Sequence, residues 1–261
     1  MVCHVLPRFW SVGAATTDLE VALLTHRAGL ASEPSATLLH NLRVPDVAAT
    51  DTVLGRVPDI TGEPCPRVFL DSRTPAWVEA ELVARDWRVE SNLQLVLAAD
   101  TGIELVPDAP IRPAGDADWE ELGALFRADH EEEDRKGGRS LRPRSRTDQV
   151  VRARRGLVAP VRYFVAELDG IAGFVAEWPG GRDGFGLVED LFVRPDHRGR
   201  DLARALIGQA VTWARSGGAR PVVIGAEPDD TPKHLHTRLG FVPTAVLRVA
   251  SPPQDDEQEA V

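Results

Sequence analysis

The segment from Leu187 to Ser216 constrains the fold most, because it joins two different hydrophobic patterns through one short turn. Residues 187–193 are typical of a strand, whereas 201–216 carry apolar residues at helical spacing. The apolar helical face consists of Leu202, Ala205, Leu206, Ala210 and Trp213. A strand, a tight turn and an amphipathic helix in this order predict an α/β fold.

The turn Arg198-Gly199-Arg200-Asp201-Leu202-Ala203 has the composition of a phosphate site. At the start of a helix several backbone N–H groups lack an intrahelical partner, and the helix dipole is positive there. Small residues let the backbone approach a ligand, and nearby arginines add positive charge. An ordinary strand-to-helix connection with solvated arginines explains the same residues, so both interpretations stay open on the turn alone.

The region after Pro107 forms a self-sufficient series of predicted elements. Asp169-Gly170 between two apolar segments is a strong signal for a two-residue hairpin. The predicted series is a strand at 111–113, a helix from Asp116 or Asp118 to about His130, a charged loop at 130–140, a helix at 146–155, hairpin strands at 163–168 and 171–178, a strand at 187–193, a helix at 201–216, a strand at 222–226, a helix at 231–239 and a strand at 244–250.

The first hundred residues contain no phosphate turn, and their pattern is less regular. The predicted elements are two short helices within 19–42, a short strand at 52–57, a strand at 67–70, a helix at 75–86 capped by Ser72 or Thr74, and a strand at 93–97. Some apolar positions recur at a constant offset of 154 positions. The matching pairs are Val68 with Val222, Leu70 with Ile224, Trp87 with Phe241, and Leu93 with Leu247.

The second half resembles the GNAT superfamily of acyl-CoA-dependent N-acyltransferases. The resemblance is carried by Val193-Arg194-Pro195-Asp196-His197-Arg198-Gly199, by the long helix that follows, and by Leu239-Gly240-Phe241-Val242. It covers about 108–250 and is most specific at 187–207. It implies a mixed, mostly antiparallel central sheet with flanking helices, preceded by a smaller α/β domain that tandem arrangements in the family explain as a degenerate GNAT-like unit.

The resemblance also implies a site for acetyl-CoA as co-substrate. The family segment Arg/Gln-x-x-Gly-x-Gly/Ala wraps the CoA pyrophosphate, and here Asp201 stands where glycine is usual. Its carboxylate could repel the pyrophosphate, or could point outward and cap the helix. The strand 187–193 is expected to splay from 222–226 and leave a slot for pantetheine. The implied CoA contacts are Leu191, Phe192, Val193, Arg198, Gly199, Arg200, Asp201, Leu202, Ala203, Arg204 and Asp229.

Acyl transfer to an amine needs a base, because an amine with a pKa of about 10 is almost fully protonated at neutral pH. Glu189 and Asp190 lie on the strand that passes the thioester, and strand alternation points them to opposite faces. We favour Glu189 as the base, with Asp190 second; a solvent-facing carboxylate is the alternative. His236 stands where the family often has a tyrosine that protonates the thiolate, and an imidazolium could serve there.

An acidic segment between the first two helices of this half is expected to meet the acceptor. A cluster of carboxylates could attract a cationic amine, although such charge runs are usually solvated loops. The candidate substrate-binding residues are Glu131, Glu132, Glu133 and Asp134.

Composition excludes several other classes. The net charge of −10 argues against a broad nucleic-acid surface. No apolar run approaches the roughly 18 residues of a membrane helix, and the first residues lack a secretory pattern. Cys3 and Cys65 form neither a disulfide framework nor a metal site. We therefore expect a cytoplasmic protein with no metal, no nucleic-acid partner and no membrane partner.

The expected division is an N-terminal domain at 1–106, a GNAT domain at 107–250 and an acidic, disordered tail at 251–261. The hypothesis is an N-acetyltransferase that acts on a primary amine of a small molecule or an aminoacyl compound. The alternative is a non-catalytic CoA-binding or interaction protein, which Asp201, Asp229 and the missing tyrosine favour. A homodimer is an open alternative for the assembly.

Overall fold

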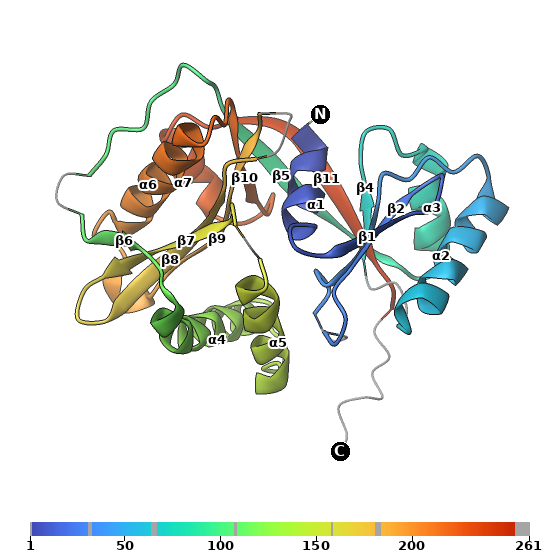
Figure 1. The fold of residues 1–261 in the computed structure, drawn as a ribbon, viewed down its shortest axis with the longest axis horizontal. Helices are drawn as coiled ribbons and strands as arrows, with labels where there is room; N and C mark the ends of the chain where they lie inside the picture. The colour runs from blue at the N-terminus through green and yellow to red at the C-terminus, as the bar shows by residue number, and fades with distance from the viewer. Residues whose placement is uncertain are drawn as a thin grey trace. The chain divides into compact units, whose positions relative to one another are not determined.

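The computed structural model of the protein describes residues 2–30, 33–63, 67–106, 109–157, 159–180 and 184–253. The chain forms two compact units (Figure 1). Unit 1 combines Met1–Gly13 with Leu93–Ala245, and unit 2 combines Ala14–Asn92 with Val246–Val261. Each unit is thus made of two separate segments of the chain, whereas the expected division placed a single boundary between residues 106 and 107. The expected tail lies outside the described residues from 254 onward.

Unit 1 contains a mixed sheet in which β9 and β10 run parallel and the other neighbours run antiparallel. In spatial order its strands are β5 (Arg88–Leu97, of which 93–97 lie in this unit), β10 (Val222–Ala226), β9 (Gly186–Val193), β8 (Ile171–Trp178), β7 (Arg162–Glu167) and β6 (Ile111–Pro113). Its helices, with η for a 3-10 helix, are η1 (Val2–His4), α1 (Val5–Trp10), η2 (Asp116–Asp118), α4 (Trp119–Lys136), α5 (Arg144–Arg155), η3 (Pro195–His197), α6 (Leu202–Ser216) and α7 (Pro232–Arg238). The predicted α/β fold is confirmed.

Helices cover both faces of this sheet, with α4 and α5 on one side and α6 and α7 on the other (Figure 1). The α6 side is closed by a core that includes Leu206, Ile207 and Ala210, all fully buried. On the α4 side the rings of Phe126 and Phe174 lie 4.5 Å apart. The predicted β7–β8 hairpin is confirmed, because Asp169 and Gly170 adopt φ values of 50° and 101°, which a primed two-residue turn requires.

Residues 2–10 belong to unit 1, although their sequence predicts no such role. Helix α1 contacts β9, and the ring of Phe9 lies 6.5 Å from that of Trp178 on β8. Phe9 is fully buried and Trp10 is 6% exposed. Aromatic burial of this kind stabilises a helix that is too short to persist alone.

Helix α4 is longer than predicted, because it continues to Lys136 and the loop begins only at Gly137. Pairs four residues apart support the extra turns: Arg127 Nε lies 2.8 Å and Arg135 Nη2 2.6 Å from the carboxylate of Glu131. Asp118 does not cap α4; its carboxylate accepts a hydrogen bond from the Gly115 N–H instead. The prediction of a charged loop at 130–140 is therefore wrong for residues 130–136, which are helical.

Unit 2 is a smaller sheet covered by two helices that lie on the same side of it (Figure 1). In spatial order its strands are β1 (Ala15–Asp18), β2 (Leu23–His26), β3 (Thr37–His40), β4 (Val68–Leu70) and β11 (Val242–Ser251, of which 246–251 lie in this unit). The helices are α2 (Val47–Thr61) and α3 (Ala76–Ala84). Only β3 and β4 run parallel among these pairs.

Two predictions for unit 2 are wrong. The helices expected within 19–42 are the strands β2 and β3; all four residues of β3 are buried, so the strand shows no alternation that a sequence pattern could reveal. The strand expected at 52–57 lies inside α2, whose start is marked by Asp46: its carboxylate accepts the Ala49 N–H at 2.8 Å. Helix α3 follows Pro75 and has no side-chain cap, so Ser72 and Thr74 do not cap it.

Each unit takes its closing strand from the other half of the chain. In unit 1, β5 pairs antiparallel with β10, and in unit 2, β11 pairs antiparallel with β4. The strands β5 and β11 begin and end 154 positions apart, as do the first residues of β4 and β10. The offset found in the sequence therefore relates equivalent strands.

Candidate active site

Strand β9 is paired with β10 along only part of its length. The parallel pairs end at Val188, which faces Ile224. From Glu189 to Val193 the strand has no partner on β10 among the described residues. The two strands therefore separate at their carboxyl ends, which leaves main-chain groups of β9 available to a ligand, as expected for the pantetheine slot.

A β-bulge lies at the point of separation. Between the pairs Ala176 with Glu189 and Phe174 with Phe192, one residue of β8 faces two residues of β9. The first of these two, Asp190, has a left-handed φ of 52°. Bulges of this kind break the alternation of side chains and often redirect a residue beside an active site.

The expectation that Glu189 and Asp190 point to opposite faces is wrong because of this bulge. The Tyr163 hydroxyl donates to Asp190 Oδ2 at 2.6 Å, and Arg154 Nε donates to the same oxygen at 3.1 Å. Tyr163 packs near Phe126 of α4, so Asp190 faces the α4 side. Alternation from Val188 in the α6-side core places Glu189 on that same side.

Glu189 has the proton affinity of a base that works near neutrality. Burial and the negative charge of Asp190 together raise the pKa of its carboxyl group to about 8, while Arg154 acts in the opposite direction. A carboxylate with this pKa accepts a proton from an ammonium group more readily than an ordinary glutamate does.

Asp129 is a site residue that sequence reasoning missed. It is half-buried on α4, and burial raises the pKa of its carboxyl group to about 8, with added contributions from the negative charges of Glu133 and Asp190. The charge of Asp190 acts on it only because the fold brings β9 near α4, whereas Glu133 lies one turn further along the same helix. The signal was available in the spacing of Asp129 and Glu133, which are four apart on a helix and share one face.

The four acidic residues predicted to meet the acceptor do not act as one group. Glu132 is held by Arg198 at 2.6 Å, and the pKa of its carboxyl group is lowered to about 2 by that guanidinium. Asp134 is buried and binds Arg142, which lowers its pKa to about 2. Glu131 forms surface pairs along α4.

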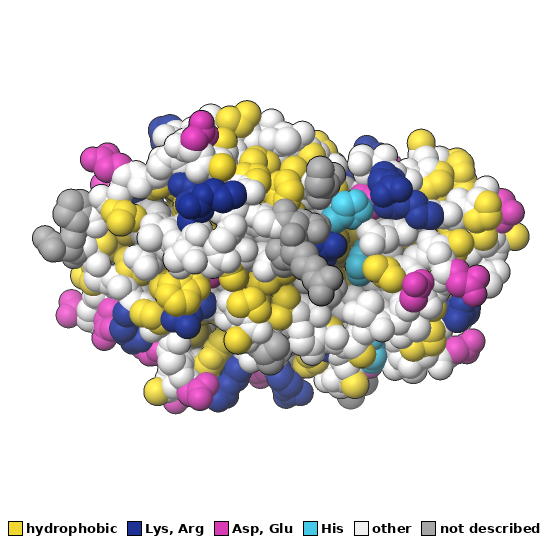
Figure 2. Space-filling view, turned by 45° about the horizontal axis from the view of Figure 1, so that its top comes forward, with side chains coloured by type: hydrophobic (Ala, Val, Ile, Leu, Met, Phe, Trp, Pro, Cys, Tyr) yellow, Lys and Arg dark blue, Asp and Glu magenta, His cyan; other side chains and the backbone are white. Residues whose placement is uncertain are grey.

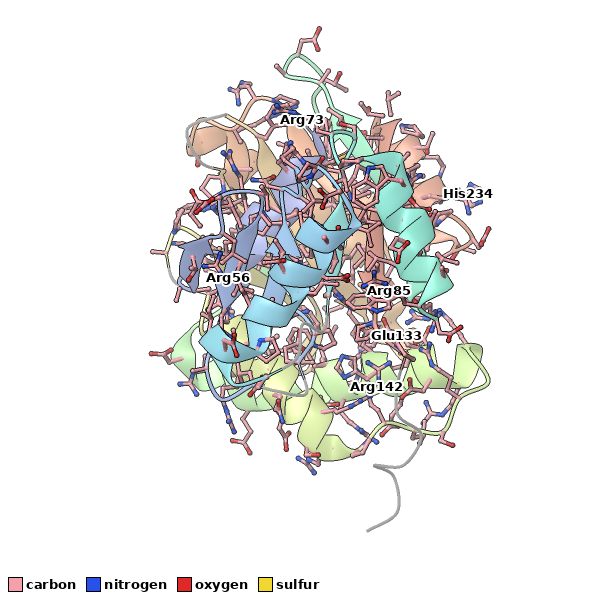
Figure 3. The ribbon with its side chains drawn as sticks, turned by 90° about the vertical axis from the view of Figure 1, so that its right-hand side faces the viewer. Arg56, Arg73, Arg85, Glu133, Arg142 and His234 are labelled. Carbon is pink, nitrogen blue, oxygen red and sulfur yellow. The ribbon has the colours of Figure 1, made fainter. Side chains whose placement is uncertain are left out.

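Of these four, Glu133 acts most strongly on Asp129 through its negative charge, and Glu132 acts less strongly in the same direction. Its carboxylate also lies 3.0 Å from Arg142, and the two side chains are labelled in Figure 3. About half of the Glu133 side chain is exposed, 52%, so a ligand can reach it. The helix therefore separates the four residues onto different faces, which a loop would not have done.

The turn before α6 presents open donors. The backbone N–H groups of residues 199–204 donate to no acceptor among the described residues. Gly199 has a φ of 73°, and a Cβ placed on it would meet nothing within 4 Å. Glycine is thus required here for its backbone conformation rather than for space. Several free N–H groups at a helix start form a site for an anion such as a pyrophosphate.

Asp201 departs from glycine without disrupting this turn. Its φ is 58°, and aspartate is among the few residues that adopt left-handed backbone readily. Its side chain is exposed and makes no capping hydrogen bond, so the capping alternative is wrong. The carboxylate leaves the N–H groups open but places a negative charge beside them.

Arg198 serves the turn by binding protein groups. Its Nε donates to the Val193 carbonyl oxygen at 2.9 Å, and its two terminal nitrogens donate to Glu132. This fork ties the turn to β9 and to α4. Arg204 pairs with the exposed Glu104, whereas Arg200 is exposed and forms no ion pair among the described residues. Arg200 is therefore the arginine most available to a phosphate.

Residues 119–241 match the model of the acetyltransferase (GNAT) family. This segment belongs to the GNAT family. The fold agrees: a GCN5-related N-acetyltransferase from Kribbella flavida is similar with a TM-score of 0.68 and 12% identity, over 98% of this chain and 96% of that one. A tandem GNAT protein from the clavulanic acid biosynthesis pathway is similar with a TM-score of 0.53 and 16% identity, over 90% of this chain and 79% of that one.

A sequence relative is the L-amino acid N-acyltransferase MnaT from Escherichia coli (strain K12). It is 38% identical over 68 residues, which are 25% of this chain and 40% of that protein. The chain thus matches less than half the length of this relative.

The GNAT segment and unit 2 differ at the equivalent helix start. Helix α2 joins the parallel strands β3 and β4, as α6 joins β9 and β10. In α2 the Asp46 carboxylate accepts the Ala49 N–H and fills the position that an anion would take. In α6 the corresponding donors stay open. Open N–H donors are thus found at the start of α6, whereas a side chain caps the start of α2.

The surroundings of His236 disfavour the imidazolium expected to protonate the thiolate. The residue is 2% exposed, and burial lowers the pKa of its imidazole to about 4. Near pH 7 the ring is therefore neutral, and the predicted imidazolium is not formed. The ring instead packs 6.2 Å from that of Phe241, which is fully enclosed in the α6-side core.

The remaining predicted CoA contacts differ in their exposure to solvent. Phe192 and Val193 are buried, Leu191 is half-buried, and Asp229 is exposed in the connection between β10 and α7.

A hollow of about 390 Å³ adjoins Arg198 between α4 and η3. It is lined by Ala128, Glu131, Glu132, Arg135, Lys136, Pro195 and Arg198.

Three wider observations concern the described part of the chain. No group of three or more His, Cys, Asp or Glu side chains in it could hold a metal ion. None of its helices has the length and apolar character needed to cross a membrane. On the face drawn in Figure 2, basic and acidic side chains are interspersed.

Proposed function

We propose that the protein transfers an acetyl group from acetyl-CoA to a primary amine of a small molecule or an aminoacyl compound. The observation that carries the proposal is that two features occur together in the GNAT segment. The N–H groups at the start of α6 are open, and Glu189, whose carboxyl group has a raised pKa, lies where β9 and β10 separate. The name of the 38% identical relative, an L-amino acid N-acyltransferase, supports an amine acceptor.

The N–H groups of residues 199–204 fit the pyrophosphate of the co-substrate, and Arg200 adds an exposed positive charge. The unpaired edge of β9 from Glu189 to Val193 fits the pantetheine arm. The thioester supplies an activated acyl carbon. The part left to the protein is to hold the amine, remove its proton and keep the reacting atoms aligned.

The acceptor enters as an ammonium ion, which Asp129, Glu133 and Glu189 attract in their ionised forms; burial favours the protonated form of each, so this attraction grows as the pH rises. Glu189 in its ionised form takes one proton from the ammonium group. The amine nitrogen then attacks the thioester carbonyl carbon, the C–N bond forms and the C–S bond breaks. The nitrogen carries a positive charge after the attack and releases its second proton to solvent. The thiolate leaves with the electron pair and takes a proton from solvent, because His236 is neutral.

Residues 1–106 are proposed to contain a degenerate GNAT-like unit that lacks a CoA site, and residues 107–250 the GNAT domain. The proposal is supported by the equivalent strands 154 positions apart and by the capped start of α2. The acidic end of the chain at 251–261 is proposed to be a disordered tail. The protein is proposed to be cytoplasmic.

The test is release of free thiol from acetyl-CoA across a panel of amino acids, aminoacyl amides and diamines. We expect the wild type to release thiol and Glu189→Gln to do so at least tenfold more slowly. The control is Glu120→Gln, a change at an exposed residue of α4. CoA binding without turnover on any amine would instead support the non-catalytic CoA-binding alternative, which the exposed Asp201 carboxylate at the turn favours.

A further inference from the structure

Asp190 is held by two donors that act on one oxygen. The Tyr163 hydroxyl lies 2.6 Å from Oδ2 and Arg154 Nε lies 3.1 Å from it. The side chains of Arg154 and Asp190 are 11% and 12% exposed, so the ion pair is largely removed from water. A pair in this environment is weakly screened and holds its geometry.

Both donors are themselves fixed by aromatic rings. The guanidinium carbon of Arg154 lies 4.0 Å from the centre of the Trp10 ring, a cation–π contact. The rings of Tyr163 and Trp119 meet edge to face at 5.2 Å. Trp10 lies on α1 and Trp119 opens α4. Four elements outside β9 thus converge on one carboxylate.

Few other charges face Glu189 and Asp190. Arg154 faces them from α5, Tyr163 from β7 and Asp129 from α4. Strand β8 sets Ala176 opposite Glu189, and the aromatic residues of α1 carry no charge. The Glu189 carboxyl group therefore responds mainly to Asp190 and to Arg154.

We propose that Arg154 and Tyr163 are positioning residues that hold the Asp190 carboxylate in the bulge beside Glu189 and so tune Glu189 as the base. The inference rests on the proposed function of Glu189. Trp10 fixes the guanidinium, which makes the N-terminal helix part of the site. The negative charge of Asp190 favours protonation of Glu189, and the positive charge of Arg154 opposes it. The network thereby keeps the base near its working range.

This arrangement predicts shifts of opposite sign from two variants. Loss of the negative charge in Asp190→Asn lets Glu189 ionise at lower pH, by about one pH unit. Loss of the positive charge in Arg154→Gln moves the same ionisation to higher pH by a similar amount. Arg154→Lys keeps the charge and stays close to the wild type. A merely structural role would not reverse the sign.

The experiment is a ¹³C NMR titration of glutamate carboxyl carbons in the full-length protein. The Glu189 signal is assigned by its loss in Glu189→Gln. Arg152→Gln, exposed on the same helix, is the matched control and leaves the signal in place. If Arg154→Gln fails to fold, Asp190→Asn and Arg154→Lys decide, with a shift to lower pH expected for the first and none for the second.

Shifts in the same direction, or no shift in Asp190→Asn, would overturn the inference. The titration needs no turnover, so its outcome is separate from that of the thiol-release assay. A wild-type protein that releases no thiol would overturn the proposed function, even where the opposite shifts are seen. In the kinetic assay Tyr163→Phe is expected to lower kcat severalfold with KM for acetyl-CoA unchanged, because the hydroxyl acts through Asp190.

Discussion

Glu177 lies at the centre of the unit 1 sheet with no exposed surface. It pairs with Val188 of β9 and with Arg162 of β7, and neither carboxyl oxygen has a hydrogen-bond partner in the described structure. Burial raises the pKa of the group to about 9, and Arg162 opposes this only in part. The side chain is therefore a neutral acid in the folded protein at pH 7, and Glu177→Gln is expected to make the protein more stable above neutrality.

The sign follows from proton binding in the two states. Above its ordinary pKa of 4.5 the unfolded chain has lost this proton, while the folded chain keeps it up to about 9. Between these values folding takes up a proton, so the free energy of unfolding falls by about 1.4 kcal/mol for each pH unit. From pH 5 to pH 8 the wild type loses about 4 kcal/mol through this group alone. Glutamine does not titrate, so the Glu177→Gln variant lacks this loss of the free energy of unfolding.

The assay is urea unfolding at pH 5, 6, 7 and 8, followed by tryptophan fluorescence. The quantity of interest is the difference in free energy of unfolding between Glu177→Gln and the wild type. That difference should move steadily in favour of the variant as the pH rises. Glu120→Gln, exposed on α4, controls for the loss of one negative charge. A difference that stays constant within about 1 kcal/mol would refute the reasoning, because the wild-type group would then titrate alike in both states.

Four further outcomes are expected. Gly199→Ala should weaken CoA binding about tenfold because alanine resists a φ of 73°, whereas Gly199→Asn should retain most of the affinity; equal losses in a calorimetric titration would point to sterics instead. Asp201→Gly should bind CoA about two- to fivefold more tightly, since it removes a negative charge from the N–H groups and tolerates the same backbone, and unchanged affinity would place the anion elsewhere. Asp46→Ala should lower the stability of unit 2 by about 1 kcal/mol through loss of the α2 cap, as measured by urea unfolding, and should leave CoA binding intact. The acid limb of kcat/KM should extend to near pH 8, because Glu189 must be ionised and its pKa is raised to about 8; a limb below pH 5 would show an ordinary carboxylate.

The C-terminal half of the fold was largely predictable, because its elements carry local signals. Helix α6 has a wide apolar face, the β7–β8 hairpin has Asp169-Gly170 at its turn, and β9 is a continuous apolar strand up to Glu189. These patterns are set by packing against one core on each side of the sheet. The GNAT resemblance then ordered the elements correctly.

The N-terminal half was read less well, since burial there depends on distant parts of the chain. Strand β3 is buried on both faces and resembles a helix segment in composition. Helix α1 was missed because its six residues gain their stability from Trp178 and β9 rather than from any helical pattern. The sequence showed β5 and β11 only as repeated apolar positions. It did not show that β5 pairs with β10 and β11 with β4.

For the candidate site, the sequence predicted Glu189 and the turn at Gly199 but not their surroundings. The bulge at Asp190 depends on the register between β8 and β9, and the residue types in these strands do not predict that register. Tyr163 and Arg154 meet Asp190 from positions 27 and 36 residues away along the chain. Only the folded sheet brings them together. Asp129 likewise comes near Asp190 only in the fold, although its spacing of four from Glu133 was visible in the sequence.

The most direct test of this account is a calorimetric titration of the full-length protein with CoA. The account predicts one site per chain, because the N–H groups at the start of α6 are open while the Asp46 carboxylate occupies the Ala49 N–H at the start of α2. Affinity should rise in Asp201→Gly and fall in Gly199→Ala. Absence of binding, or two equivalent sites per chain, would contradict the assignment of the α6 turn as the CoA site.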